Sequence, residues 1–186
     1  MSIYFPTAPA TFIHILKNGG SSIEDWAYQS GIEYKMLPSH CDLTTARNIV
    51  GNVGTTFTTV RNPYDRIVSQ YHYAKQLMYK DMSTEDKIKH DMIFKKGFGY
   101  YVDCLYANDF PFKPVQEHSV LSWWFSKKCQ IDWFDTTPDI VLRLENIYND
   151  FEQIKDLIGA HNPLIHRSRT VRQDYKDYYT DDIKRK

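Results

Sequence analysis

One segment combines a lysine, two glycines and two serines, residue types that together favour binding of an anion: Lys17-Asn18-Gly19-Gly20-Ser21-Ser22. Glycine lets a backbone approach an anion closely, serine hydroxyls donate hydrogen bonds, and Lys17 supplies a compact positive charge. The segment lies between a predicted buried strand and a predicted helix, where backbone N–H groups and the helix dipole also favour phosphate. It therefore predicts a phosphate site. The alternative is a tight strand-to-helix turn in which the lysine is incidental.

The order of these residues distinguishes the segment from a Walker A loop, which reads Gly-x-x-x-x-Gly-Lys-Ser/Thr. Here Lys17 precedes the glycines. This order disfavours an ordinary P-loop nucleoside triphosphatase and removes the need for the Mg²⁺ that the Walker serine or threonine serves. No grouping of His and Cys in the sequence has the spacing of metal ligands, so no metal site is predicted.

A second segment, Val60–Ser69, places an arginine where a predicted strand ends and a helix begins. Asn62 is a suitable N-cap, and Pro63 suits the first helical position. Ser69 is expected about 10 Å along this helix. Arg61 and Ser69 are therefore candidates for holding a second phosphate.

Apolar runs of β type must position both segments. Nearly continuous apolar residues are typical of strands that are covered on both faces. The predicted strands are Thr11–Leu16, Thr55–Val60 and Ile140–Leu144, with a weaker one at Glu33–Leu37. Because these runs alternate with helical patterns, we predict an α/β fold: one P-loop-like domain with a short parallel β-sheet flanked by helices. Its ligand site should lie at the carboxyl ends of the strands.

Predicted helices follow both candidate phosphate segments and the last strand. Ser21 or Ser22 is expected to cap the first helix, because a serine hydroxyl can accept a hydrogen bond from a free N–H of the first turn. The last helix is expected over Asn146–Ile158, with Gly159 as its C-cap. These helices would cover both faces of the predicted sheet.

Size and composition limit the classes of function that remain. A chain of 186 residues predicts a single domain over residues 1–186. Lys plus Arg and Asp plus Glu number 23 each, so a nucleic-acid partner is not expected and any anion site must be local. The three cysteines have no paired spacing, which fits reduced thiols. Neither a membrane span nor a signal peptide is recognisable, and we expect a cytoplasmic location.

Together the two candidate phosphate segments resemble the sulfotransferases that use 3′-phosphoadenosine 5′-phosphosulfate (PAPS). The resemblance is to the Golgi-type carbohydrate branch, which includes heparan sulfate sulfotransferases, and to its bacterial and viral relatives. Phe12–Ile23 is similar to the 5′-phosphosulfate loop of that family, and Arg61–Tyr71 is similar to its 3′-phosphate motif. Val141–Asn146 and the tyrosine-rich tail resemble later family segments, so the resemblance covers most of the chain.

The resemblance implies the sulfotransferase fold, PAPS as the sulfuryl donor and adenosine 3′,5′-bisphosphate as the product. It implies that Lys17 contacts the phosphosulfate, and that Arg61 and Ser69 bind the 3′-phosphate. The remaining cofactor-binding positions are Asn18 and the residues that cradle the 5′-phosphate, which are Gly19, Gly20, Ser21 and Ser22.

Sulfuryl transfer requires a base at the acceptor hydroxyl and a positive charge at the departing oxygen. Lys17 suits the second task. His40 is our predicted base, because it follows the weak strand at 33–37 and resembles the family's catalytic histidine by position and by its His-x-Asp context. The alternative for His40 is a surface or capping role. His118 is a second candidate base or an acceptor contact, and Glu117 is a carboxylate alternative.

Other chemistry-bearing residues have two interpretations each. His14 lies within a predicted buried strand and is expected to be a hydrogen-bonded core residue. Arg167 and Arg169 in the basic tail are possible contacts to the cofactor or to the acceptor, or else belong to a solvated tail. The pair Trp133 and Phe134 is expected in the core more than as a stacking surface for a sugar.

The predicted function is therefore in-line transfer of the sulfuryl group of PAPS to an acceptor hydroxyl, with His40 as general base. A carbohydrate is the default acceptor, because the resembling branch mostly acts on carbohydrates. One alternative is a Mg-dependent nucleotide or small-molecule kinase with an atypical phosphate loop, which the position of Lys17 counts against. Another is a non-catalytic nucleotide-binding module.

Overall fold

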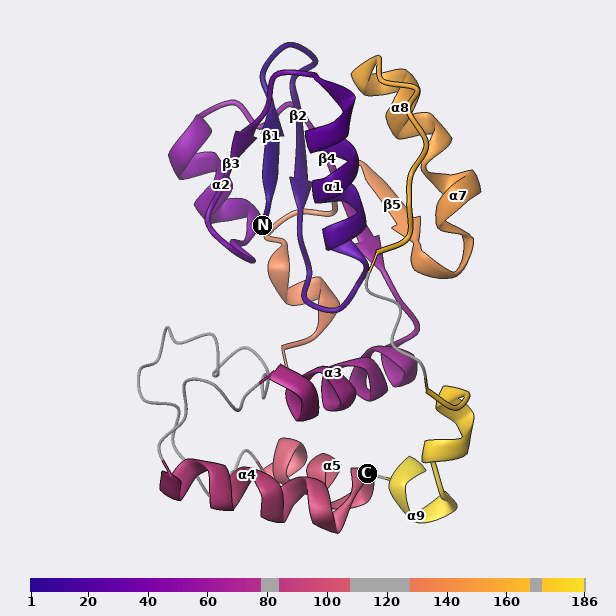
Figure 1. The fold of residues 1–186 in the computed structure, drawn as a ribbon. Coiled ribbons are helices and arrows are strands. Elements are labelled where there is room, and N and C mark those ends of the chain that lie inside the picture. Colours follow the sequence, from indigo (N-terminus) through magenta and orange to yellow (C-terminus); the bar gives the residue numbers. More distant parts are fainter. Residues whose placement is uncertain (78–83, 108–127, 168–171, 186) are drawn as a thin grey trace. The chain divides into compact units, whose positions relative to one another are not determined.

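A computed structural model describes residues 1–77, 84–107, 128–167 and 172–185, which fall into two compact units (Figure 1). The sheet unit comprises Met1–Asn62 and Cys129–Arg169. The helical unit comprises Pro63–Lys128 and Thr170–Lys186. A single domain over residues 1–186 stays a prediction. Within the described ranges, none of the helices has the length and apolar character needed to cross a membrane.

The sheet unit is built on a five-stranded sheet in the order β3-β1-β2-β4-β5. Its strands are β1 (Ile3–Phe5), β2 (Ala10–Ile13), β3 (Lys35–Met36), β4 (Thr55–Val60) and β5 (Ile140–Arg143). The strands β2, β4 and β5 are parallel, with Phe12 beside Phe57 and Thr59 beside Leu142. The strand β1 runs antiparallel to both of its neighbours. The predicted α/β fold is confirmed, with one antiparallel strand that the sequence pattern did not indicate.

Helices cover both faces of this sheet, as expected. One face packs against α1 (Gly20–Ser30), α7 (Ile147–Asp150) and α8 (Glu152–Ile158). The other face packs against α2 (Leu43–Val50) and the short helix η1 (Gln130–Trp133). Alternation of side chains along each strand explains the two layers, since Phe12 points into the first core and Ile13 into the second.

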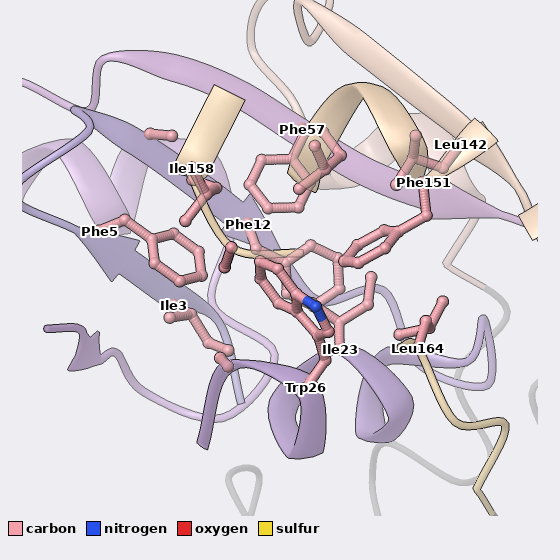
Figure 2. Packing of buried hydrophobic residues seen from close by; sticks show 14 of the residues in the cluster. Ile3, Phe5, Phe12, Ile23, Trp26, Phe57, Leu142, Phe151, Ile158 and Leu164 are labelled. Atoms are coloured by element: carbon pink, nitrogen blue, oxygen red, sulfur yellow. The ribbon is translucent and has the colours of Figure 1, made fainter. Parts of the chain in front are cut away.

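Aromatic rings fill the core beneath α1 (Figure 2). The Trp26 ring meets the Phe151 ring edge to face, with centroids 4.8 Å apart, and Phe57 packs against Phe12 at 5.3 Å. The indole N–H of Trp26 donates to the carbonyl of Asn162 at 3.1 Å, so this large side chain is buried without losing its hydrogen bond. The packing fixes α1, and therefore the loop that precedes it, against the sheet.

The helix boundaries differ from expectation at one important place. The N-cap of α1 is Gly19 in a left-handed conformation, and no side chain caps the helix, so the predicted cap by Ser21 or Ser22 is wrong. The last predicted helix appears as three short elements, η2 (Leu144–Asn146), α7 and α8. The helices α7 and α8 meet at Phe151. Its predicted C-cap Gly159 is confirmed, with a left-handed φ of 79°.

The helical unit contains α3 (Pro63–Leu77), α4 (Thr84–Lys96), α5 (Phe98–Ala107), η3 (Tyr175–Tyr178) and α9 (Asp181–Lys184). Its core is aromatic: the Tyr71 ring contacts the rings of Phe94 and Tyr101 at centroid distances of 5.1 Å and 5.3 Å. The hydroxyl of Tyr178 lies 2.7 Å from Nε2 of His72, which joins η3 to α3. The helix α3 begins at Pro63, as predicted.

Candidate functional site

The loop between β2 and α1 has a backbone conformation that few sequences tolerate. Lys17 and Gly19 both adopt left-handed φ angles, of 65° and 83°. A Cβ atom at Gly19 would lie 2.6 Å from Leu144 Cδ1, and one at Gly20 would lie 2.1 Å from Cδ2 of His14. The two glycines are therefore required by close packing, and they leave the start of α1 without side chains that would keep an anion away from its N–H groups.

Asn18 holds this loop from within the protein. Its fully buried side chain donates from Nδ2 to the carbonyl of Thr59 at 2.9 Å and to Oε1 of Gln130 at 2.6 Å. Its backbone N–H donates to the carbonyl of Ile15 at 3.3 Å. The side chain that the sequence assigns to cofactor binding is thus engaged in fixing the loop to the end of β4, and we propose a positioning role for Asn18.

Arg61 lies beside Lys17. It follows the last residue of β4, and its Nη1 donates to the backbone carbonyl of Lys17 at 3.1 Å. Because β2 and β4 are adjacent and parallel, the segments that leave them meet at the same edge of the sheet. The structure therefore brings the lysine of one predicted phosphate segment and the arginine of the other together in the sheet unit.

Gln130, the first residue of η1, is a further member of this arrangement that the sequence did not predict. Its Oε1 accepts from the backbone N–H of Arg61 at 2.9 Å, and its Nε2 donates to the carbonyl of Arg61 at 2.8 Å. The same Oε1 accepts from Asn18. Gln130 lies 69 residues from Arg61 and 112 from Asn18 in the sequence, so no local pattern could have indicated this role.

His40 has an unusual backbone and a defined tautomer. Its φ is 52°, a left-handed value that is uncommon for histidine. Its Nδ1 lies 3.1 Å from the carbonyl oxygen of His14. A carbonyl can only accept, so Nδ1 carries the proton and Nε2 is the basic nitrogen of the neutral ring. Trp133 donates its indole N–H to the carbonyl of His40 at 3.2 Å, which helps to fix this residue.

The surroundings of His40 keep it neutral. Burial of the ring lowers its pKa from the ordinary value of 6.5 to about 4, and the positive charges of Lys17 and the N-terminal ammonium act in the same direction. The ring of His14 meets the His40 ring edge-on, with centroids 4.4 Å apart. His40 at neutral pH is thus an uncharged imidazole that can accept a proton on Nε2.

His14 is the buried, hydrogen-bonded core residue that the sequence predicted. The residue is 6% exposed, and Nδ1 of its ring lies 2.7 Å from Oε1 of Glu24. Burial holds the pKa of His14 well below its usual range, and the positive charges of the N-terminal ammonium and Lys17 act in the same direction. Its carbonyl orients His40, while its ring fills the space beside Gly20.

The serines at the start of α1 differ in exposure. Ser21 is exposed, whereas Ser22 is buried and its hydroxyl oxygen accepts the backbone N–H of Arg167 at 2.9 Å. The Arg167 guanidinium forms an ion pair with Asp25. These contacts place Arg167 beside the first turns of α1, the helix that follows the loop.

The remaining predicted site residues are elsewhere. Ser69 is a buried residue of α3 in the helical unit. Arg169, His118 and Glu117 lie outside the described residues. Trp133 is 3% exposed and packs in the core beneath α2, which agrees with its predicted core role. Asp42, from the His-x-Asp context, accepts the backbone N–H of Thr45 as the N-cap of α2.

The arrangement in the sheet unit is suited to binding an anion. Lys17, Arg61 and the amino end of α1 are positive or donate hydrogen bonds, and a neutral histidine has its basic nitrogen defined nearby in the fold. In the described part of the chain, no group of three or more His, Cys, Asp or Glu side chains is arranged to hold a metal ion.

Comparison with known proteins adds one match. A family model described as the sulfotransferase family matches residues 29–186 of this chain. The matched region begins after the Lys17–Ser22 loop and includes His40, Arg61 and Gln130. No curated protein and no solved structure matches the chain.

Proposed function

The chain belongs to the sulfotransferase family and is a sulfotransferase, and from this we propose that it moves the sulfuryl group of PAPS to an acceptor hydroxyl on a carbohydrate, with His40 as general base. The observation that carries the proposal is the contact between the two predicted phosphate segments. Arg61 Nη1 lies 3.1 Å from the carbonyl of Lys17 at the edge where β2 and β4 end. A donor with a phosphosulfate and a separate 3′-phosphate requires two such cationic positions close together.

The residues present fit this donor. The loop has no Cβ at Gly19 or Gly20, and the space that a Cβ would need is already occupied by Leu144 and His14. An anion that approaches the backbone N–H groups at the start of α1 also meets the favourable end of the helix dipole. We propose that Lys17, Ser21 and Ser22 hold the 5′-phosphosulfate with this backbone, and that Arg61 holds the 3′-phosphate.

When bound, PAPS supplies an activated sulfuryl group whose departure leaves adenosine 3′,5′-bisphosphate. In our proposal His40 accepts the acceptor hydroxyl proton on Nε2, because the hydrogen bond from Nδ1 to His14 defines that nitrogen as the base. Lys17 stabilises the negative charge that develops on the phosphate oxygen of the breaking bond. The negative charge of the donor would also raise the pKa of His40 towards the range in which a base is effective at neutral pH.

The first test is calorimetric titration of the purified chain with adenosine 3′,5′-bisphosphate in the absence of Mg²⁺, with 5′-AMP and ATP as comparisons. We expect the bisphosphate to bind most tightly. Arg61→Ala should weaken its binding by about 1.5–3 kcal/mol, the usual size of a charge-assisted hydrogen bond. The control is Arg47→Ala. This variant removes an arginine of α2 that pairs with Asp135, and it should leave nucleotide binding unchanged.

Two results would reject the donor proposal. One is a preference for ATP that requires Mg²⁺, which would favour a kinase. The other is absence of bisphosphate binding. The acceptor is tested separately by following transfer of radiolabelled sulfuryl groups from PAPS to sulfate-free glycans and to tyrosine peptides. Transfer to the peptides alone would leave the donor assignment intact and reject the carbohydrate.

A further inference from the structure

We infer that Gln130 is a positioning residue that sets the spacing between the Lys17–Ser22 loop and Arg61, an inference that rests on the proposed function. A single amide side chain bonds both segments: Oε1 accepts from Asn18 and from the backbone N–H of Arg61, and Nε2 donates to the Arg61 carbonyl. The hydrogen bonds of Gln130 go to Asn18 and to the backbone of Arg61, so its role is to fix the two segments relative to each other.

The orientation of this amide follows from its partners. A backbone N–H can only donate and a backbone carbonyl can only accept, so the contacts with Arg61 fix which end of the Gln130 amide is oxygen. The oxygen is then also the atom that faces Nδ2 of Asn18 at 2.6 Å. All three hydrogen bonds are therefore satisfied by one orientation, which makes the connection stiff.

Asn18 depends on this connection. Its side chain is fully buried, and its Oδ1 has no hydrogen-bond partner in the described structure. The two bonds from Nδ2, to Thr59 and to Gln130, are thus the polar contacts that hold the side chain. Loss of Gln130 would leave a buried donor with one partner fewer and would remove the tie between the loop and the residue after β4.

The spacing matters only for a ligand that uses both positions. A nucleotide with one phosphate engages either the loop or Arg61, and its affinity does not depend on the distance between them. A bisphosphate engages both, so it gains affinity from the second contact only while the two positions match its length. Disturbing the spacing should therefore weaken bisphosphate binding more than monophosphate binding.

The experiment measures the dissociation constants of adenosine 3′,5′-bisphosphate, 5′-AMP and 3′-AMP for the full chain and for Gln130→Met. Methionine keeps the length of the side chain and removes every hydrogen bond. We expect the bisphosphate to bind roughly 10–100-fold more weakly, the range of losses that follow a small misplacement of a binding group. Both monophosphates should change by less than about 3-fold, since each contact by itself survives. The control is Gln29→Met, an exposed glutamine of α1.

A merely structural role predicts a different pattern. In that case Gln130→Met lowers the thermal midpoint while all three nucleotides keep their affinities at a temperature well below it, and the inference is rejected. Equal losses for all three would also reject it, because they indicate damage to the positions themselves. If the unmodified chain does not prefer the bisphosphate, the proposed function fails and the inference fails with it. This result differs from failure of the inference alone, in which the unmodified chain prefers the bisphosphate and Gln130→Met has no selective effect.

A second variant keeps the test decisive if Gln130→Met does not fold. Gln130→Glu retains an oxygen that can accept from Asn18 and from Arg61 N, and replaces the donor that faces the Arg61 carbonyl by a second oxygen. The two oxygens repel, so the side chain must move. We expect the same selective loss of bisphosphate affinity, and unchanged selectivity among the three nucleotides would overturn the inference.

Discussion

At the scale of single residues, the backbone conformation of His40, our proposed base, defines the tautomer of its ring. Its left-handed φ of 52° turns the ring so that Nδ1 donates to the carbonyl of His14. The cost of this backbone conformation for a residue other than glycine is on the order of 1 kcal/mol, and the bond from Trp133 to the His40 carbonyl helps to offset it. The result is a ring with one defined basic nitrogen.

The matching prediction uses His40→Asn. Asparagine tolerates left-handed φ better than alanine does, so the variant should keep the backbone and lack only the base. We expect turnover to fall roughly 10²–10⁴-fold, the usual range for loss of a general base, while affinity for adenosine 3′,5′-bisphosphate stays within about 3-fold. Steady-state kinetics and calorimetry give the two quantities. Unchanged turnover would exclude His40 as the base.

The lowered pKa of His40 also predicts how stability responds to acid. Its pKa is about 4 in the folded chain and the ordinary 6.5 when unfolded, so between these values the unfolded chain binds more protons. The free energy of unfolding must then decrease as the pH falls from 6.5 to 4, with His40 contributing on the order of 2–3 kcal/mol. Urea unfolding at pH 7, 5.5 and 4.5 measures this. His40→Asn should lose less stability over the same interval, and an equal loss would contradict the assigned cause.

At the scale of elements, the loop between β2 and α1 is limited by packing as much as by charge. The ring of His14 occupies the position that a side chain at Gly20 would need. The same residue offers its carbonyl to His40. His14 thus contacts both the loop at Gly20 and the proposed base His40. A change at Gly20 should therefore affect the position of His40.

Gly20→Ala tests this connection. A Cβ only 2.1 Å from the His14 ring forces the ring to move, and overpacking of this kind costs about 1–3 kcal/mol. Gly99→Ala is the matched control: it also lies in a helix, but its Cβ would sit 3.4 Å from Ile183 Cδ1, so the variant should be neutral or more stable by up to about 1 kcal/mol. Chemical denaturation compares them. Equal effects would mean that contact with His14 is unimportant.

The elements also explain what the sequence could predict. Thr55–Val60 was recognisable as a strand because its run of β-branched residues around Phe57 is typical of strands, and the structure has β4 over the same residues. The strand β1, at Ile3–Phe5, is only three residues long and gives no such signal. The cap of α1 was mispredicted because Gly19 takes the left-handed position, which leaves no place for a serine hydroxyl to cap.

The candidate site also contains residues that a local sequence pattern indicates and residues that only the folded structure shows. Lys17 and Arg61 could be predicted because each stands at the junction of a strand with a helix, which is a local pattern. Gln130 could not, because its partners lie 69 and 112 residues away and its own neighbours carry no signal. The positioning role of Asn18 depends on burial, which a polar residue in a glycine loop does not indicate.

At the scale of the whole molecule, the absence of net charge changes how the anionic donor is captured. With 23 Lys plus Arg and 23 Asp plus Glu residues, long-range attraction is small, and in our proposal the affinity comes from local contacts at Lys17, Arg61 and the amino end of α1. Binding should therefore stabilise the sheet unit directly, since all three belong to it. A ligand at 100 times its dissociation constant adds about 2.7 kcal/mol to the free energy of unfolding of the part of the protein that unfolds together with its binding site.

Amide hydrogen exchange, measured with and without adenosine 3′,5′-bisphosphate, identifies the segments that the ligand stabilises. We expect slower exchange at the amides of Lys17–Ser22 and at Arg61. In our proposal the ligand contacts these residues, and bound ligand disfavours the local unfolding that exposes their amides to exchange. Arg61→Ala should remove the slowing at position 61 while the amides of the Lys17–Ser22 loop remain protected. Unchanged exchange at all of these amides would reject Lys17–Ser22 and Arg61 as the binding positions.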